Sequence, residues 1–366
     1  MLCTINLNHE SKTRTMNTWT YTLSFVISLV LAMAIIPVVI NYARRKQLFD
    51  EPGARKKHTE KVSSLGGIGI FIAWAISAGM LLVPQSGNTM AAFALALPLF
   101  ILAIIDDIHT VGVTTRLVFQ ALTAVLAFEL GFKLELIENA WLLNLGATVF
   151  VTMAMINAFN LIDGINGLSG ILGTVASVAF GWHFFSNGYE QLAIASFAYA
   201  GALVGFLRFN FGNKAKIFMG DNGSVVLGYF MALMTIATIK IGNTPNGDLA
   251  TAFQLSFGVI ALPMADMFKV SVTRVLNGNS PFFGDRSHVH HLYVDNEVSH
   301  PVASIILGII QLTTVVLAVI LESRVFWFIA PVLILAPYVI ANLFVLAKSR
   351  SITTPSRNDA ERRVPA

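Results

Sequence analysis

The chain has 366 residues, of which 55% are hydrophobic and 12% are charged. A soluble protein of this length carries about twice that charged fraction, so the composition excludes an ordinary soluble fold. The apolar runs are continuous rather than alternating, which argues against a transmembrane β-barrel. The single cysteine, Cys3, excludes an internal disulfide or a cysteine metal cage. The composition therefore predicts an all-α polytopic membrane protein.

The apolar runs predict about eleven membrane spans, because each is long enough to cross a hydrocarbon layer of ~30 Å. They cover residues 19–40, 66–83, 91–105, 117–131, 141–158, 169–186, 192–207, 225–242, 251–269, 301–321 and 325–347. We expect three regions: a polar N-terminal extension over 1–18, a single transmembrane domain over 19–347 that carries the candidate catalytic residues, and a disordered cytoplasmic tail over 348–366.

The distribution of basic residues predicts the topology. The loop after the first span is rich in lysine and arginine, so the positive-inside rule places it in the cytoplasm. An odd number of spans then puts the N-terminus in the periplasm and the C-terminus in the cytoplasm of a bacterial inner-membrane protein. Asp248 maps to the outer side and Asp266 lies within a span, whereas the other aspartates face the cytoplasm. We therefore expect the chemistry on the cytoplasmic face.

The first cytoplasmic loop, DEPGARKKHTEKVSSLGG, is basic and close to the membrane. Such a segment typically sets the topology and meets anionic lipid. Lys57 and His58 are also candidates to contact a phosphate group, and the sequence leaves both interpretations open.

An acidic pair, Asp106-Asp107, ends the third predicted span. Adjacent carboxylates repel each other, so they suit a site where a divalent cation or a cationic partner offsets them, or where repulsion holds one of them as a base. The simpler interpretation is a helix end that enters water.

The segment NAFNLIDGINGLSG follows the fifth span and combines carboxamides, a carboxylate and glycines. Glycine permits tight turns and a close backbone approach to a ligand. The polar side chains offer oxygens to a metal and donors to a nucleotide, although a plain polar loop is the alternative. The candidate residues are Asn157, Asn160, Asp163 and Asn166.

A third acidic segment, FMGDNGSVVLG, places Asp221 between two glycines just before the eighth span. An aspartate at a helix start is compatible with simple N-capping. It equally suits a Mg²⁺ ligand, because Mg²⁺ is usually held by one or two carboxylates together with phosphate oxygens.

A histidine-rich segment, GDRSHVHHL, lies between the ninth and tenth spans. Zinc is a possible ligand for histidines, but no fourth ligand occurs at a suitable spacing. Phosphate binding is the more economical interpretation, and solvated loop histidines are the simplest alternative. The candidate residues are Arg286, His288, His290 and His291.

Together, these segments resemble the polyprenyl-phosphate N-acetylhexosamine-1-phosphate transferases, glycosyltransferase family 4. That family carries an Asp-Asp pair, an NxxDGxDGL-like loop, a GDxGS segment and a histidine-rich loop. The corresponding residues here are 106–107, 160–168, 220–224 and 288–291, and the resemblance runs from about Asp50 to Leu292 in the same order. Many bacterial members have an aspartate where this chain has Asn166, which offers an oxygen but no charge.

Within the family, the H-x-H-H loop is similar to the branch that uses UDP-GlcNAc, whereas the branch that uses UDP-MurNAc-pentapeptide carries three consecutive histidines. The resemblance implies transfer of GlcNAc-1-phosphate from UDP-GlcNAc to undecaprenyl phosphate, which gives undecaprenyl-diphospho-GlcNAc and UMP. This is the first step of O-antigen or enterobacterial common antigen type synthesis. UDP-MurNAc-pentapeptide and other UDP-N-acetylhexosamines stay open as donors.

The resemblance also implies roles for the candidate residues. Asp106 and Asp107 would lie near the lipid phosphate, one of them as a base, and Asp163 would contact the nucleotide. Mg²⁺, with Mn²⁺ as a substitute, would be bound by Asp221 and Asn160. The remaining candidates would hold phosphate, sugar or nucleotide; they are Asn157, Asn166, Arg286, His288, His290, His291, Lys57 and His58.

An ion-coupled transporter is the alternative from a different class. Transporters place their key polar groups near the bilayer midplane, often in two repeated halves, whereas here the acids lie at loop edges on one side and no repeat is visible. No nucleic-acid partner is expected, and a homo-oligomer stays open.

Overall fold

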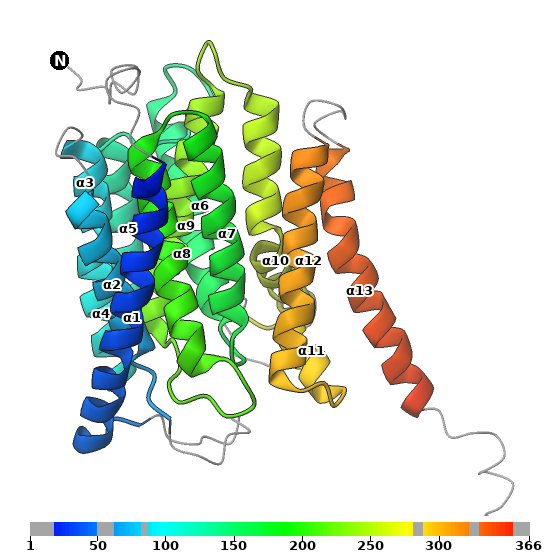
Figure 1. The fold of residues 1–366 in the computed structure, drawn as a ribbon. Helices are drawn as coiled ribbons and strands as arrows, with labels where there is room; N and C mark the ends of the chain where they lie inside the picture. Colours follow the sequence, from blue (N-terminus) through cyan, green and yellow to red (C-terminus); the bar gives the residue numbers. More distant parts are fainter. Residues whose placement is uncertain (1–17, 50–61, 82–86, 281–287, 322–328, 354–366) are drawn as a thin grey trace, which may run out of the picture.

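The structure is a computed structural model that describes residues 18–49, 62–81, 87–280, 288–321 and 329–353. In these residues all regular secondary structure is helical, and most helices run side by side in one bundle (Figure 1). The helices are α1 (Trp19–Lys46), α2 (Gly66–Leu81), α3 (Gly87–Ala94), α4 (Ala96–Ile108), α5 (Val113–Glu129), α6 (Trp141–Ile162), α7 (Leu168–Ser186), α8 (Glu190–Asn210), α9 (Asp221–Gly242), α10 (Leu249–Leu276), α11 (Val289–Asp295), α12 (His300–Ile320) and α13 (Ala330–Thr353).

Within the described residues, nine helices are long and apolar enough to cross a membrane, with α3 and α4 counted together as Gly87–Ile108. The chain is therefore a multi-pass membrane protein. The apolar helix α2 is shorter, at 16 residues, and α5 has 17. Each of the eleven predicted spans corresponds to a helix in the expected order, but the number of crossings and the side of each terminus stay predictions.

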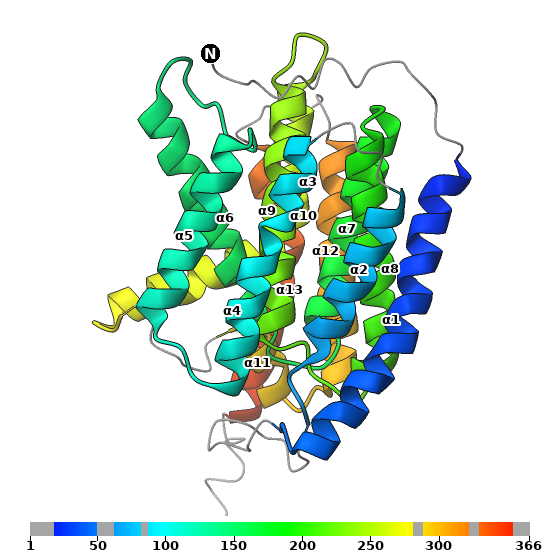
Figure 2. The same ribbon diagram turned by 90° about the vertical axis from the view of Figure 1, so that its left-hand side faces the viewer.

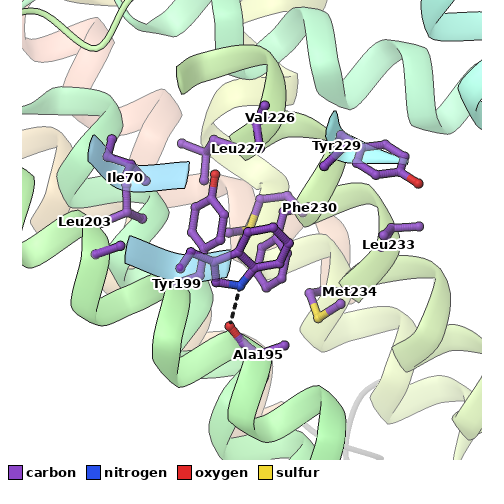
Figure 3. Close-up of a cluster of buried hydrophobic side chains, with 14 of the residues drawn as sticks. Ile70, Ala195, Tyr199, Leu203, Val226, Leu227, Tyr229, Phe230, Leu233 and Met234 are labelled. Carbon is purple, nitrogen blue, oxygen red and sulfur yellow. Dashed lines mark hydrogen bonds between the residues drawn. The ribbon is translucent and has the colours of Figure 1, made fainter. Parts of the chain in front are cut away.

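The centre of the bundle is formed by α8 and α9, whose most apolar segments are 72% and 89% buried. Aromatic side chains fill the space between them and α2 (Figure 3). Tyr199 of α8 stacks on Phe230 of α9 with ring centroids 4.3 Å apart, and the indole of Trp74 donates a hydrogen bond to the carbonyl oxygen of Ala195, 3.2 Å away. This packing fixes α9, whose first residue is Asp221.

The helix α10 changes direction along its length. Its C-terminal part runs sideways out of the bundle, whereas the neighbouring helices run along the bundle axis (Figure 2). Pro263 lies inside α10 and explains the bend, because proline has no backbone N–H and its ring clashes with the preceding turn. Asp266 and Arg274, which both contact His288 just before α11, lie in the part of α10 that follows Pro263.

Candidate active site

The start of α9 is held in place by a glycine and by the neighbouring start of α2. Gly220 precedes it with φ +73°, and a Cβ at this position would collide with the carbonyl oxygen of Ser64. The preceding residues are tied to the start of α2, since the amides of Gly66 and Gly67 each donate to carbonyls of 218–219 at 2.9 Å. Glycine is therefore required at position 220 by both backbone conformation and space.

The N-terminus of α9 is capped by Asp107 of α4, not by its own Asp221. The carboxylate of Asp107 accepts hydrogen bonds from the amide of Asp221 at 3.1 Å, from the amide of Asn222 at 2.9 Å and from the Asn222 side chain. A carboxylate at this position is favoured because it meets unpaired N–H groups and the positive end of the helix dipole. The N-capping interpretation of Asp221 is thus wrong, and its side chain is left to the site.

The other member of the acidic pair, Asp106, shares a cation with Asp221. One guanidinium nitrogen of Arg116, at the start of α5, lies 2.9 Å from Oδ2 of Asp106 and 3.3 Å from Oδ2 of Asp221. Asp106 also accepts from the amide of Val111 at 2.7 Å. The two carboxylates, which are 115 positions apart along the chain, therefore converge on one cationic group. Arg116 was not among the predicted residues.

The α6 helix contributes the two predicted asparagines. The amide nitrogen of Asn160 donates to Oδ1 of Asp221 and to Oγ of Ser224, both at 2.9 Å. Asn157, one turn earlier, donates to Oε1 of Gln120 at 2.8 Å and so ties α6 to α5. Asn160 therefore belongs to the carboxylate cluster, whereas Asn157 borders it.

Asp163 directly follows the last residue of α6. It accepts a hydrogen bond from the hydroxyl of Ser169 in α7. Burial raises the pKa of Asp163 to about 7, the hydrogen bond from Ser169 opposes this rise, and the negative charge of Asp221 adds to it. A carboxyl group with such a pKa exchanges protons near neutral pH.

The loop after Asp163 is held by asparagines from two segments. Asn166 is buried, and its amide nitrogen donates to the carbonyl of Gly212 at 2.8 Å. The next residue, Gly167, has φ +85° and its amide donates to the side chain of Asn210 at 2.6 Å. The structure therefore places Asn166 in the support of the loop, not on its exposed side.

The histidine-rich segment lies against this loop. A Cβ on Gly164 would overlap the imidazole of His290, so the missing side chain allows the close contact. The ring centroid of His291 lies 4.3 Å from that of His290. His288 is buried beside Asp266 of α10, with Nδ1 of the ring 2.8 Å from Oδ2. Lys57, His58 and Arg286 lie outside the described residues.

Two residues that sequence reasoning did not select occupy central positions. Arg116 pairs with both Asp106 and Asp221, and Asp266 contacts His288. A basic residue soon after the acidic pair would have been one signal for the first. For the second, an ionisable residue within a predicted span is by default a functional candidate.

The carboxylates, amides and Arg116 thus gather at one end of a membrane bundle, where they can bind a charged, phosphate-containing substrate beside lipid. Comparison with known proteins agrees with this arrangement. The model of the family "Glycosyl transferase family 4" matches residues 89–239, a range that includes the acidic pair, the asparagine segment and Asp221.

Three curated relatives are similar over most of the chain. The undecaprenyl-phosphate alpha-N-acetylglucosaminyl 1-phosphate transferase of Yersinia pestis is 30% identical over 289 residues, which is 76% of this chain and 78% of the relative. The protein of the same name from Escherichia coli K12 is 29% identical, over 68% of this chain and 70% of the relative. The probable undecaprenyl-phosphate N-acetylglucosaminyl 1-phosphate transferase of Bacillus subtilis is 28% identical, over 89% and 93%.

The fold and these similarities define a membrane-embedded transferase. The chain belongs to glycosyl transferase family 4, and the predicted family resemblance is confirmed.

Proposed function

We propose that the protein transfers GlcNAc-1-phosphate from UDP-GlcNAc to undecaprenyl phosphate at the cytoplasmic face of a bacterial inner membrane. The observation that carries this proposal is the convergence of Asp106, Asp221 and Asn160, from three different helices, at one end of the bundle. The names of the relatives support the acceptor and the donor. In this role the enzyme would begin O-antigen or enterobacterial common antigen type synthesis.

In the proposed reaction, a phosphate oxygen of the lipid attacks the β-phosphorus of the sugar nucleotide. A new P–O bond forms, the bond between the β-phosphorus and the bridging oxygen breaks, and UMP leaves with the electron pair. The lipid keeps the sugar on a diphosphate. Phosphoryl transfer of this kind depends mainly on positioning and on neutralising the charge of the phosphate oxygens.

The hydrogen bonds distinguish the two acids of the pair. Asp107 already accepts three hydrogen bonds from α9, so we assign it to holding Asp221 in place. Asp106 accepts one hydrogen bond at each oxygen, from the amide of Val111 at Oδ1 and from Arg116 at Oδ2, and its carboxylate also lies beside that of Asp221. Of the pair, Asp106 is therefore the better candidate to meet the lipid phosphate and to accept a proton from it, and we assign Asp163 to contact with the nucleotide.

A divalent cation fits the donor set, and we propose Mg²⁺, with Mn²⁺ as a substitute. Within the described residues, no three His, Cys, Asp or Glu side chains are grouped to hold a metal by themselves. Asp221 offers carboxylate oxygens, and it already lies beside the cationic guanidinium of Arg116. The side-chain nitrogen of Asn160 faces Asp221, so this amide would have to turn over to offer its oxygen to the ion. Mg²⁺ commonly takes only one or two carboxylates and completes its shell with substrate phosphates. When bound, the ion would neutralise the pyrophosphate.

The direct test is an assay of membranes that contain the protein, with undecaprenyl phosphate, Mg²⁺ and UDP-GlcNAc. We expect UMP and a lipid-linked GlcNAc, and EDTA should abolish both. UDP-GalNAc and UDP-MurNAc-pentapeptide run in parallel. Turnover of the pentapeptide donor alone would keep the family and refute the donor that we propose. Absence of UMP with every donor, in folded protein, would refute the enzyme assignment and favour transport.

A matched pair of variants controls for nonspecific loss of charge. Asp221→Asn should lower activity by about 100-fold or more, since it removes the carboxylate that would hold the cation against the phosphates. Asp248→Asn removes a carboxylate at the opposite end of α9, where Asp248 caps α10, and asparagine caps equally well. Activity of Asp248→Asn should equal that of the wild type.

A further inference from the structure

One buried carboxylate of α10 joins the start of the histidine-rich segment to the bundle, beside the apolar packing of Val289 and Tyr293. Asp266, which is 1% exposed, accepts from the amide of Val289 at 2.7 Å and lies 2.8 Å from Nδ1 of His288. Asp266 lies less than one helical turn after Pro263, where α10 bends. A charged group in the interior of a membrane protein is costly unless it is paired, and these two contacts from the start of α11 provide the pairing.

The hydrogen-bonding chemistry fixes the tautomer of His288. The carboxylate of Asp266 only accepts, so Nδ1 of His288 carries a proton. A guanidinium only donates, and Nη2 of Arg274 lies 3.4 Å from Nε2, so Nε2 is the accepting nitrogen. Both ring nitrogens of His288 therefore face residues of α10. The ring is also buried, which leaves His288 without a nitrogen directed at a substrate.

This arrangement separates His288 from the other histidines of the segment. His290 lies against Gly164 in the loop of Asp163, and His291, the more exposed of the two, lies beside it. Their positions relative to the carboxylate cluster depend on where α11 starts. The start of α11 is set by Asp266, which binds both the side chain of His288 and the next backbone amide.

We propose that Asp266 and His288 form a buried strut that positions the histidine-rich segment at the active site. Both members of the strut are positioning residues. Asp266 holds the ring of His288, and His288 holds the start of α11 instead of binding phosphate or sugar itself. This inference deepens the proposed function and rests on it for its activity readout.

The two amide substitutions of His288 provide a sharp test. The side-chain nitrogen of asparagine takes the place of Nδ1 and can still donate to Asp266, whereas glutamine reaches the place of Nε2 and loses that bond. The strut predicts that His288→Asn retains most of the wild-type kcat/KM and that His288→Gln loses about 100-fold, because a misplacement of ~1 Å has an effect of that size. Direct substrate binding through Nε2 predicts the reverse order, which would overturn the proposal.

A double-mutant cycle in thermal stability tests the strut independently of the donor. Tm is measured in detergent for Asp266→Ala, His288→Ala and the double variant. Because each single change already breaks the pair, the double variant should be little less stable than the worse single variant. Shifts in Tm that simply add would overturn the strut. Wild-type protein without transferase activity would refute the proposed function instead, while the cycle would still decide on the strut.

Discussion

At the scale of single residues, the environment of Asp163 disfavours the ionised form of its carboxyl group. Its pKa is raised to about 7 by burial and by the charge of Asp221, against the hydrogen bond from Ser169. In the unfolded chain an aspartate has a pKa of about 3.9. The folded protein therefore binds a proton more tightly than the unfolded chain between these values, and its stability should fall as the pH rises through this window.

This linkage predicts the behaviour of Asp163→Asn. The variant cannot ionise, so it should lose part of the wild-type decline in Tm between about pH 4 and pH 7, and near pH 7 it should be more stable by on the order of 1 to 3 kcal/mol. Tm of both proteins is measured in detergent with EDTA and without substrate. Parallel Tm curves across this range would show that the folded protein does not hold Asp163 protonated. Under the proposed function, transferase activity of the variant should fall, because Asp163 is the carboxylate proposed to contact the nucleotide.

At the scale of elements, the bend of α10 requires support from a neighbouring helix. Pro263 has no N–H, so the carbonyl of Val259 one turn earlier lacks its helical donor. The side chain of Gln311 in α12 donates to this carbonyl and, at 3.2 Å, to that of Gly258. Neighbouring side chains commonly satisfy backbone groups that a proline frees in a membrane helix. The position of Asp266, just after the bend, depends on this contact.

We therefore expect Gln311→Leu to destabilise the protein by about 1 to 3 kcal/mol, the usual effect of a buried carbonyl left without a donor. Thermal unfolding in detergent measures the loss. Leu312→Ala is the matched control, since Leu312 is next in sequence but 51% exposed on the outside of the bundle. Equal Tm values for Gln311→Leu and wild type would show that the bend needs no support from the side chain of Gln311.

At the scale of the whole molecule, the bundle separates two ends that differ in chemistry. The acidic pair, Asp163 and the start of α9 share one end, and the loop between α9 and α10 lies at the other, because α9 has 22 residues and so is about 33 Å long. The positive-inside rule predicts that the acidic end faces the cytoplasm. A sugar nucleotide made in the cytoplasm could then reach it without crossing the membrane.

Cysteine labelling tests this orientation. The only cysteine is Cys3, so Cys3→Ala gives a cysteine-free background for single substitutions at exposed positions. A membrane-impermeant maleimide should label Asn246→Cys, between α9 and α10, in intact spheroplasts. It should label Thr110→Cys, after α4, only once the membrane is permeabilised. Both positions are exposed in the bundle. The reverse pattern would place the carboxylate cluster outside the cell and contradict the topology.

The helices and most of the candidate residues could be predicted from the sequence, because they depend on local properties. A continuous apolar run can satisfy its backbone in lipid only as a helix, and acidic or amide side chains at the ends of such runs stand out against the apolar background. The acidic pair, Asn160, Asp163 and Asp221 were found in this way, and the order of their segments predicted the family.

The partners of these residues were decided by the tertiary structure. Asp107 caps a helix that begins 114 positions later, Arg116 joins Asp106 to Asp221, and Asp266 holds His288. Nothing local relates these residues, since each contact depends on how the helices pack and on where α10 bends. The sequence by itself therefore determined which groups carry charge and that they lie at the ends of the apolar helices. Packing decided which carboxylates hold the framework and which stay available to a substrate.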